Sequence, residues 1–299
     1  MKPLSFVIIT YNRPVEALEL VKNITTLHHA QELLEEVLIV NNASTESYAQ
    51  VKQFIDEHKE INFRFMDAPQ NLGVSRGRNF AVRQATAPIL ILLDDDAEMQ
   101  EDALVHIMEA YRQNEKIAIV TFKVIYYQTR QMQVNAFPHK QFDKYKDVPD
   151  MYTYYYAGGA HAIKKEVLDK VGHYPEDFFY GMEEYDLSYR ILDMGYSIYY
   201  DSRIVMLHKE SPLGRKPKNE KLQEMWVNKC KVAWRYLPKK YYYSTAFMWS
   251  LQYLKVTRDI GGYFKGWKAV AGIPSREKRT PVSAATLRYL QSVEARLWY

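Results

Sequence analysis

Short apolar runs alternate with amphipathic segments through the first half of the chain. The apolar runs predict strands at residues 5–10, 37–40, 62–66 and 88–93. The segments between them predict helices at residues 14–27 and 47–58, with Pro14 well suited to a first helical turn, and a loop over residues 71–77 that opens a third helix through Ala85. Strands and helices that alternate at this spacing indicate βαβ units. The predicted fold class is therefore α/β, with a mostly parallel, Rossmann-like sheet flanked by helices.

The second half is less regular. A strand is predicted at 117–127, an aromatic and then glycine-rich segment at 152–163, a helix at 183–194 and strand-like runs at 197–207. From Lys209 the chain becomes rich in lysine and arginine, and after residue 240 it mixes aromatic and apolar residues with scattered basic ones. We therefore expect a first domain over 1–208 and a C-terminal helical extension over 209–299, which either packs on that domain or folds as a domain of its own.

Composition narrows the class of protein. The 299 residues contain 47% hydrophobic and 25% charged residues, which is ordinary for a globular protein, and the net charge of +4 gives no indication of nucleic-acid binding. The single cysteine, Cys230, cannot form an internal disulfide, which fits a reducing cytoplasm. The first apolar run is too short for a signal peptide, and no run of 18 apolar residues is present. We expect a cytoplasmic protein.

Polar residues gather where three of the predicted strands end. They are Thr10, Tyr11, Asn12 and Arg13 after the first strand, Asn41, Asn42, Ala43 and Ser44 after the second, and Asp94, Asp95 and Asp96 after the fourth. In parallel sheets, ligands bind at the carboxyl ends of the strands. These three clusters therefore predict one ligand site.

The three consecutive aspartates directly follow a buried apolar strand. Adjacent carboxylates repel one another unless a cation lies nearby, and Mg²⁺ and Mn²⁺ prefer oxygen ligands of this kind. This position favours a metal site over the alternative, a solvated acidic turn that caps the next helix.

Two further groups are candidates for chemistry. Glu183, Glu184 and Asp186 open a predicted helix after an aromatic segment, where they either complement the helix dipole or supply a general base whose pKa is raised by apolar surroundings. His208 ends an apolar run, and taken alone it is more typical of a hydrogen-bonded core residue than of a metal ligand.

A glycine-containing segment, Asn71 to Asn79, opens the third predicted helix. Backbone N–H groups at such a helix start can hold phosphate, with Arg76 or Arg78 adding positive charge. The segment is not a dinucleotide fingerprint, because that pattern would have to follow the first strand, where Thr10 stands instead.

The order of these pieces resembles the family 2 glycosyltransferases of the GT-A fold. The matching stretches are Val7–Arg13, Val40–Ser44, Asn71–Gly73 with Arg78 and Asn79, Leu93–Asp96, Gly158–Ala160 and Phe179–Leu187. Together they fall within residues 4–208. The later part is similar to the bacterial rhamnosyltransferase and galactofuranosyltransferase branch.

The resemblance implies a role for each matching residue. Thr10 and Asn42 would line the nucleotide base pocket, within a nucleotide-sugar site that also includes Tyr11, Asn12, Arg13, Asn71, Gly73, Arg76, Arg78, Asp94, Asp95, Gly158 and Gly159. Asp96 and His208, with Asp94, would hold Mg²⁺ or Mn²⁺. Glu184 matches the catalytic base, with Glu183 and Asp186 beside it. The family more often has aspartate at the base position, so that either Glu184 or Asp186 is the base.

The implied activity is an inverting transfer of a sugar from a nucleotide diphosphate donor to a hydroxyl group. A dTDP- or UDP-sugar, with rhamnose the first sugar to test, would be the donor, and a glycan or lipid-linked oligosaccharide of bacterial surface polysaccharide synthesis the acceptor. A nucleotidyltransferase and a non-catalytic nucleotide-sugar-binding protein of the same fold are the alternatives. Basic residues interleaved with tryptophan and tyrosine over residues 226–267 predict either peripheral contact with the inner face of the cell membrane or an ordinary helical subdomain or homodimer contact.

Overall fold

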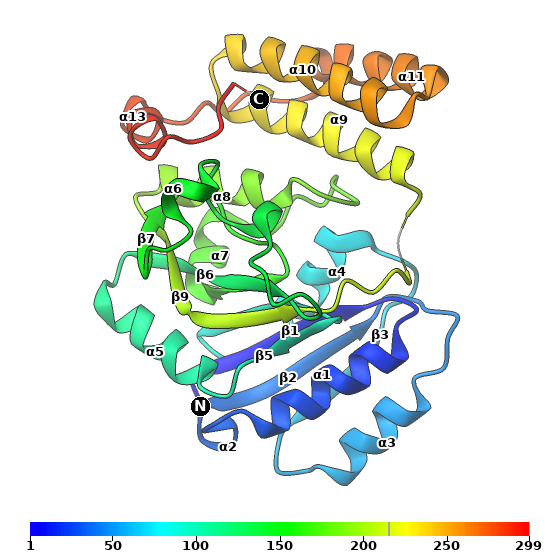
Figure 1. The fold of residues 1–299 in the computed structure, drawn as a ribbon, viewed down its shortest axis with the longest axis vertical. Coiled ribbons are helices and arrows are strands. Elements are labelled where there is room, and N and C mark those ends of the chain that lie inside the picture. Colours follow the sequence, from blue (N-terminus) through cyan, green and yellow to red (C-terminus); the bar gives the residue numbers. More distant parts are fainter. Residues whose placement is uncertain (215, 299) are drawn as a thin grey trace.

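The structure is a computed structural model that describes residues 1–214 and 216–298. Within those residues, nine strands form one sheet in the order β3-β2-β1-β4-β8-β6-β9-β5, and β7 pairs with β9 (Figure 1). The strands are β1 (Leu4–Thr10), β2 (Leu34–Asn41), β3 (Phe63–Asp67), β4 (Ile89–Asp94), β5 (Ala97–Met99), β6 (Ile117–Tyr126), β7 (Asp150–Thr153), β8 (Ala160–Lys164) and β9 (Ser197–His208).

Helices cover both faces of this sheet, and the helices that follow β9 form a further layer. The helices are α1 (Pro14–Thr26), α2 (Ala30–Leu33), α3 (Ala49–Glu57), α4 (Gly73–Val82), α5 (Ala103–Gln113), α6 (Phe142–Tyr145), α7 (Lys165–Val171), α8 (Glu183–Asp193), α9 (Lys218–Tyr236), α10 (Lys239–Thr257), α11 (Ile260–Ala271), α12 (Ile273–Arg276) and α13 (Ala284–Ser292). The α/β class with flanking helices and a helical C-terminal part is confirmed.

The pairing of the strands follows the sequence pattern in the first half and departs from it in the second. β1, β2, β3 and β4 are mutually parallel, as the alternation of strands and helices predicts. β8 runs antiparallel to β4 and β6, and β5 and β7 run antiparallel to β9, so the completed sheet is mixed. The start of β8 and the end of β9 both lie at the site described below.

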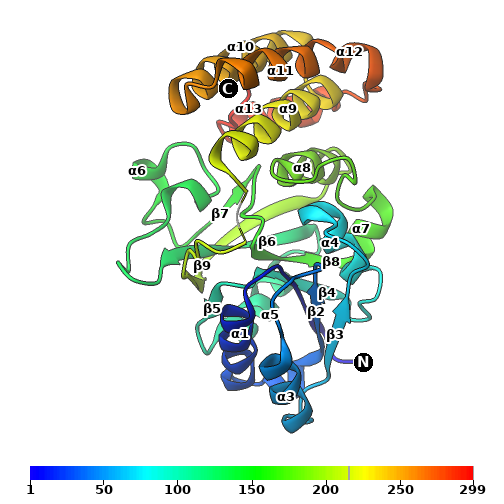
Figure 2. The ribbon, with the colours of Figure 1, turned by 90° about the vertical axis from the view of Figure 1, so that its right-hand side faces the viewer.

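Alternate residues of the central strands enter two separate cores. Phe6 and Ile8 of β1 pack with α1, α3 and α5, whereas Val7 packs on the opposite face with α4, α7 and α8. Successive side chains of a strand point to opposite faces, so a strand buried on both sides reads as a continuous apolar run. Figure 2 shows the sheet between these two helical layers.

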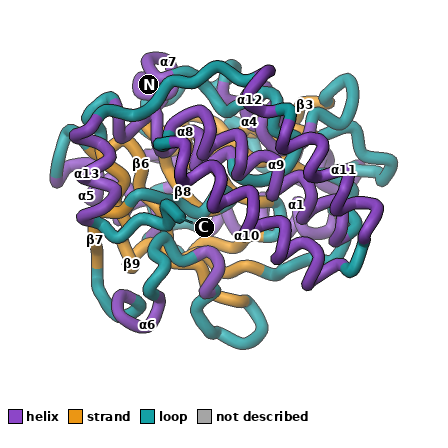
Figure 3. The backbone as a smooth tube through the Cα atoms, turned by 90° about the horizontal axis from the view of Figure 1, so that it is seen from above, coloured by secondary structure: helices purple, strands orange, loops and turns teal. Residues whose placement is uncertain are grey.

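The C-terminal helices form a further layer over the second of these cores. α9, α10 and α11 lie above α8 in Figure 1, and Figure 3 shows them from above, covering the centre of the molecule. Trp226 of α9 is fully buried, and it belongs to the same apolar cluster as Val7 and Leu187. Among the described residues, none of the helices has the length and apolar content needed to cross a bilayer.

Candidate active site

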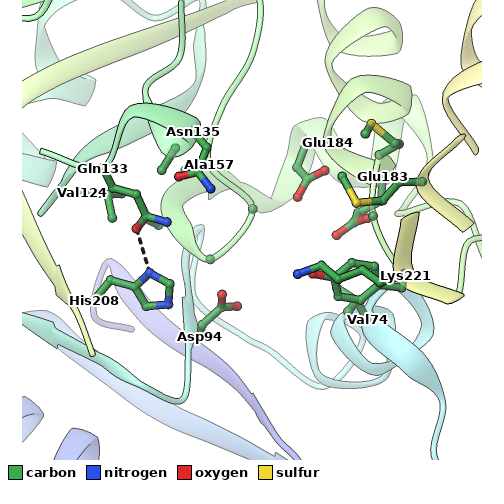
Figure 4. Close-up of a pocket in the computed structure, with 18 of the residues that line it drawn as sticks. Val74, Asp94, Val124, Gln133, Asn135, Ala157, Glu183, Glu184, His208 and Lys221 are labelled. Carbon is green, nitrogen blue, oxygen red and sulfur yellow. Dashed lines mark hydrogen bonds between the residues drawn. The ribbon is translucent and has the colours of Figure 1, made fainter. Parts of the chain in front are cut away.

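A cavity of about 1080 Å³ opens at the carboxyl ends of β1, β2 and β4. It is bounded on its other side by α8, α9 and α10, so the sheet and the C-terminal helices both contribute to its wall. The predicted site residues that line it are Thr10, Tyr11, Asn12, Arg13, Asn42, Asn71, Gly73, Arg78, Asp94, Asp95, Asp96, Gly158, Gly159, Glu183, Glu184 and His208. Figure 4 shows Asp94 and His208 on one side of this space and Glu183 and Glu184 on the other.

The pairing of β5 with β9 brings Asp96 and His208 together. Ala97 is the partner of His208 in this antiparallel pair, and Asp96 directly precedes Ala97. His208 Nε2 lies 3.4 Å from Asp96 Oδ1. Asp96 and His208 are far apart in the sequence. They meet because β5, which directly follows the aspartates, pairs antiparallel with β9, the last strand along the chain.

Gln133, which no motif in the sequence singled out, orients His208. Its Oε1 accepts a hydrogen bond of 2.7 Å from His208 Nδ1 (Figure 4). With Nδ1 engaged there, Nε2 is the ring nitrogen that faces Asp96. Hydrogen bonding of the second ring nitrogen is typical of histidines that bind metals.

Arg13 neutralises the aspartates at the end of β4. Its guanidinium lies 2.7 Å from Asp95 Oδ1 and 3.3 Å from Asp96 Oδ2. Burial raises the pKa of Asp95 to about 7, although Arg13 opposes this shift. Burial also disfavours the ionised form of Asp96, but His208, Arg13 and the backbone N–H of Ser211 outweigh it and lower the pKa of Asp96.

Asp96 and His208 carry donor groups of the kinds that bind divalent cations. Within the described residues, no group of three or more histidine, cysteine, aspartate or glutamate side chains could hold a metal ion. Asp96 and His208 nevertheless place one carboxylate oxygen and one imidazole nitrogen 3.4 Å apart, and both donor types suit Mn²⁺. Mg²⁺ and Mn²⁺ sites in nucleotide enzymes commonly use few protein ligands and complete their coordination with substrate phosphates and water.

Asp94 faces the cavity beside Gly159. Leu93 pairs with Ala160 in the β4–β8 ladder, which sets Gly159 against the end of β4. A Cβ atom at Gly159 would overlap the Asp94 carboxyl group, so only glycine fits this close approach. Asp94 is half-exposed, and Arg78 Nη2 lies 3.6 Å from its Oδ1.

Arg78, in the middle of α4, contacts the first turn of α8. It is buried, and its Nη1 donates a hydrogen bond of 2.9 Å to Glu183 Oε1. Glu184 follows on the same turn, and a Cβ atom at Gly158 would overlap its carboxyl oxygen. Burial, with the neighbouring Glu183, raises the pKa of Glu184 to about 8, against the opposing effect of Arg78.

Two predicted site residues lie outside the cavity wall. Asp186 accepts hydrogen bonds from Arg190, Arg235 and the Tyr236 hydroxyl, and it is 2% exposed. Arg76 donates from Nε to the carbonyl oxygen of Leu72, one turn earlier. Of the two carboxylates considered as a base, only Glu184 borders the cavity.

Polar side chains at the ends of β1 and β2 hold the loops that surround the cavity. Asn42 accepts a hydrogen bond from Leu72 N at 2.8 Å and donates to Asn71 Oδ1 at 3.2 Å. The Thr10 hydroxyl lies 2.7 Å from the Tyr48 hydroxyl. Gly73 begins α4 with φ +71°, directly against Phe179, a geometry that glycine adopts without strain.

Part of the cavity wall carried no recognisable motif in the sequence. Lys229 of α9, Trp249 of α10, Arg296 near the C-terminus and the segment around Phe137 all line the cavity. Lys229 and Trp249 belong to the basic and aromatic segment of the sequence, but only the packing of α9 and α10 over α8 shows which members of that segment face inward.

The sequence matches a known family over more than half of its length. The model of the family described as glycosyl transferase family 2 matches residues 5–172. An uncharacterized protein of Haemophilus influenzae is 30% identical over 174 residues, which cover 58% of this chain and 92% of that protein.

A longer transferase and a solved structure are also similar. N-acetylgalactosaminyltransferase 6 of Drosophila melanogaster is 27% identical over 265 residues, and the match covers 80% of this chain but only 39% of the relative. The crystal structure of GalNAc-T7 with UDP, GalNAc and Mn²⁺ superposes with a TM-score of 0.70 at 15% identity, covering 99% of this chain and 59% of that one. At this identity, the superposition shows a shared fold.

Proposed function

The chain belongs to glycosyl transferase family 2, and from this premise we propose that it is an inverting, metal-dependent glycosyltransferase that uses a nucleotide diphosphate sugar. The observation that carries the proposal is the arrangement of three groups around one cavity: the Asp96–His208 pair, Arg78 with Asp94, and Glu184. Such a transfer requires ligands for a metal ion, a positive charge for the leaving diphosphate and a base for the acceptor hydroxyl. These three groups could supply them.

The donor would lie along the carboxyl edge of the sheet. Thr10, Asn42 and the surrounding loops would contact the nucleoside, and Asp94 and Asp95 would lie near the ribose and diphosphate. Arg78 would face the diphosphate, where its charge opposes the negative charge that develops on the leaving group. Asp96 and His208 would hold Mn²⁺ or Mg²⁺, and the bound ion would supply Lewis-acid stabilisation of that same charge.

Glu184 would act as the general base. Its carboxylate would take the proton of the acceptor hydroxyl while the acceptor oxygen forms a bond to the anomeric carbon. The bond between that carbon and the diphosphate oxygen breaks on the opposite side, and its electron pair leaves with the diphosphate. A single displacement of this kind inverts the anomeric configuration. Asp186 is a weaker choice, because Arg190, Arg235 and Tyr236 already engage it away from the cavity.

A donor panel tests this function. Thermal shift with UDP-, dTDP- and GDP-sugars and Mn²⁺ should raise the melting temperature for one nucleotide class, because a ligand that binds only the native state stabilises it. EDTA should abolish both the shift and sugar transfer. The dTDP-rhamnose arm tests the rhamnosyltransferase branch, and the UDP-sugar arm tests the chemistry named for the GalNAc-T7 structure. No shift with any nucleotide sugar would contradict the proposal and favour the alternatives.

We also propose that the outer helices contact an anionic membrane that carries a lipid-linked acceptor. Tyr243, Phe247 and Leu251 follow one face of α10 and are 63%, 55% and 45% exposed, while Ile260 and Phe264 of α11 are 64% and 67% exposed. The exposed lysines and arginine of these helices are Lys239, Lys240, Lys255, Arg258, Lys265 and Lys268. Exposed apolar side chains with basic neighbours are typical of interfacial helices.

This surface differs from the one that the aromatic pattern alone indicates. Trp226 and Trp234 are buried, and Lys231 and Arg235 form ion pairs with Asp177. Phe247→Ser with Phe264→Ser should therefore reduce sedimentation with anionic vesicles. Equal sedimentation with neutral vesicles, or a concentration-dependent dimer that the double variant abolishes, would contradict membrane contact.

A further inference from the structure

One lysine of the cavity wall is buried without a partner. Lys229 of α9 is 5% exposed, and among the residues that the structure describes, its ammonium group has no hydrogen-bond partner and forms no ion pair. Its Nζ lies 3.0 Å from the centroid of the Tyr185 ring, which also borders the cavity. A buried ammonium group without a counter-charge is costly, so Lys229 favours its neutral amine form in the empty cavity and would take up a proton when an anion binds beside it.

The neighbours of Lys229 on the same helix behave differently. Lys231 Nζ lies 2.6 Å from Asp177, and Arg235 contacts Asp177, Asp186 and Glu277. Lys231 and Arg235 therefore both form ion pairs, and their contacts with Asp177 and Asp186 link α9 to the preceding part of the chain. Lys229 is the basic residue of α9 that combines deep burial with a place on the cavity wall.

A second cation lies beside it. Arg296, which follows α13, lines the same cavity and, within the described part of the chain, has no ion pair of its own. Burial lowers the pKa of Lys229 well below its ordinary value, and the charge of Arg296 lowers it further, while Glu184 opposes both effects. A bound oxyanion would relieve the repulsion between the two cations.

Aromatic rings lie next to Lys229. Its ammonium group contacts the Tyr185 ring, which stacks on Tyr155 with the two centroids 4.6 Å apart, and Trp249 lines the same cavity. Flat rings beside charged donors suit a sugar that carries a charged substituent, because a ring provides apolar contact for a sugar face while the cations bind the substituent.

We infer that Lys229 and Arg296 form an anion subsite that binds a phosphate or carboxylate group of the acceptor. The inference rests on the proposed function, because it assigns this end of the cavity, beyond Glu184, to the acceptor. The acceptor would then be an acidic sugar or a sugar phosphate, and the anion would fix its hydroxyl beside the base.

Binding of small charged sugars tests the subsite. The protein is first saturated with Mn²⁺ and the nucleoside diphosphate that stabilises it most, which fills the donor end. Glucose 6-phosphate, glucuronate and glucose are then titrated in separate arms. We expect at least one charged sugar to bind about tenfold or more tightly than glucose, and the arm that binds identifies phosphate or carboxylate as the group recognised.

Three variants assign the effect to these residues. Lys229→Met and Arg296→Gln should each reduce the preference for the charged sugar by about tenfold while leaving the binding of glucose unchanged. Lys239→Met, which removes an exposed lysine outside the cavity wall, should retain it. Arg296 is exposed, so its variant folds even if a change at Lys229 disturbs α9.

The outcomes separate this inference from the proposed function. Nucleotide binding with no preference for either charged sugar, or with an equal loss in Lys239→Met, overturns the subsite and leaves the glycosyltransferase proposal intact. Failure of every nucleotide to bind contradicts the proposed function in the preceding donor experiment, before any sugar is added, and the subsite falls with it.

Discussion

At the scale of single residues, Glu184 is the carboxyl group on which the proposed chemistry depends. Replacing it by glutamine keeps the size of the side chain but removes the proton acceptor. We expect Glu184→Gln to lower the rate of sugar transfer by about 10²–10⁴-fold with little change in donor binding. Steady-state kinetics and a nucleotide thermal shift measure the two effects separately. Turnover near the wild-type rate would move the base assignment away from Glu184.

The raised pKa of the same residue predicts how stability depends on pH. Burial moves this pKa from 4.5 to about 8 in the folded chain. The folded chain holds the proton of this carboxyl more tightly than the unfolded chain does. Its contribution to the unfolding free energy is therefore fully present below the unfolded-state pKa of 4.5, and it is lost as the pH rises toward the folded-state pKa of about 8. Wild-type protein should therefore lose about 1–3 kcal/mol more unfolding free energy than Glu184→Gln between about pH 5 and pH 8. Urea denaturation at both pH values measures this difference, and parallel losses in the two proteins would contradict it.

Some of these residues could be recognised in the sequence, whereas the roles of others depend on contacts that only the folded chain makes. Asp94 to Asp96 were visible because three carboxylates at the end of an apolar strand are unusual, and the resemblance added His208 and Glu184. Gln133 has no such signature, because a glutamine becomes an orienting group only through the fold that sets it against a histidine. Lys229 lies in the basic and aromatic segment over residues 226–267, but its burial depends on how the C-terminal helices pack.

The role of Gln133 leads to a test of the metal site. Gln133→Leu removes the acceptor that holds His208 Nδ1 and leaves both proposed ligands in place. Loss of such an orienting group commonly lowers metal affinity about 10–100-fold. Mn²⁺ titration in the presence of the bound nucleoside diphosphate should show this decrease. Gln131→Leu, at an exposed position two residues earlier, is the matched control and should keep the wild-type affinity.

At the scale of elements, the site depends on the register between strands. The alternation of apolar and polar segments predicted β1 to β4 and the helices between them. β1, β2 and β4 each contain four or more consecutive apolar residues, whereas Arg64 interrupts the apolar run of β3. It could not predict that β5 and β8 return antiparallel, since pairing partners far apart in the chain leave no periodic signal. Those two strands are the ones that bring His208 to Asp96 and Gly159 to Asp94.

The close approach of β8 to β4 is open to a direct test. In Gly159→Ala the new methyl group would overlap the Asp94 carboxyl group, so the aspartate must turn away from the cavity. We expect donor affinity to fall about tenfold or more, with the fold retained. Isothermal titration with the donor nucleotide measures the change. Gly261→Ala serves as the control, because its methyl group would meet only Asp259 at an ordinary distance of 3.6 Å. Equal affinities for the two variants would show that the position of Asp94 does not matter for the donor.

At the scale of the whole molecule, the C-terminal helices share an apolar core with the part of the chain that precedes them. We propose that residues 1–208 and 209–299 are distinct in sequence character but unfold as one unit. Trp226 supports this, because it is fully buried in the apolar cluster that also contains Val7 and Leu187. Arg235 adds ion pairs from α9 to Asp177 and Asp186 across the same boundary.

Truncation of Trp226 should therefore weaken the whole chain and not only its last helices. Trp226→Ala removes the ring that packs against Tyr253 and Trp267, and such a change in a core costs about 3–5 kcal/mol. In calorimetry, the wild type and the variant should each show one unfolding transition, and the melting temperature of the variant should be lower. Near-ultraviolet circular dichroism, which reports on aromatic packing throughout the molecule, should change over the same temperature range.

The opposite outcome is a variant that shows two transitions, one at a lower temperature and one at the melting temperature of the wild type. That result would establish the C-terminal helices as an independent domain. Their contribution to the acceptor end of the cavity would then depend on docking between two domains, not on a common core.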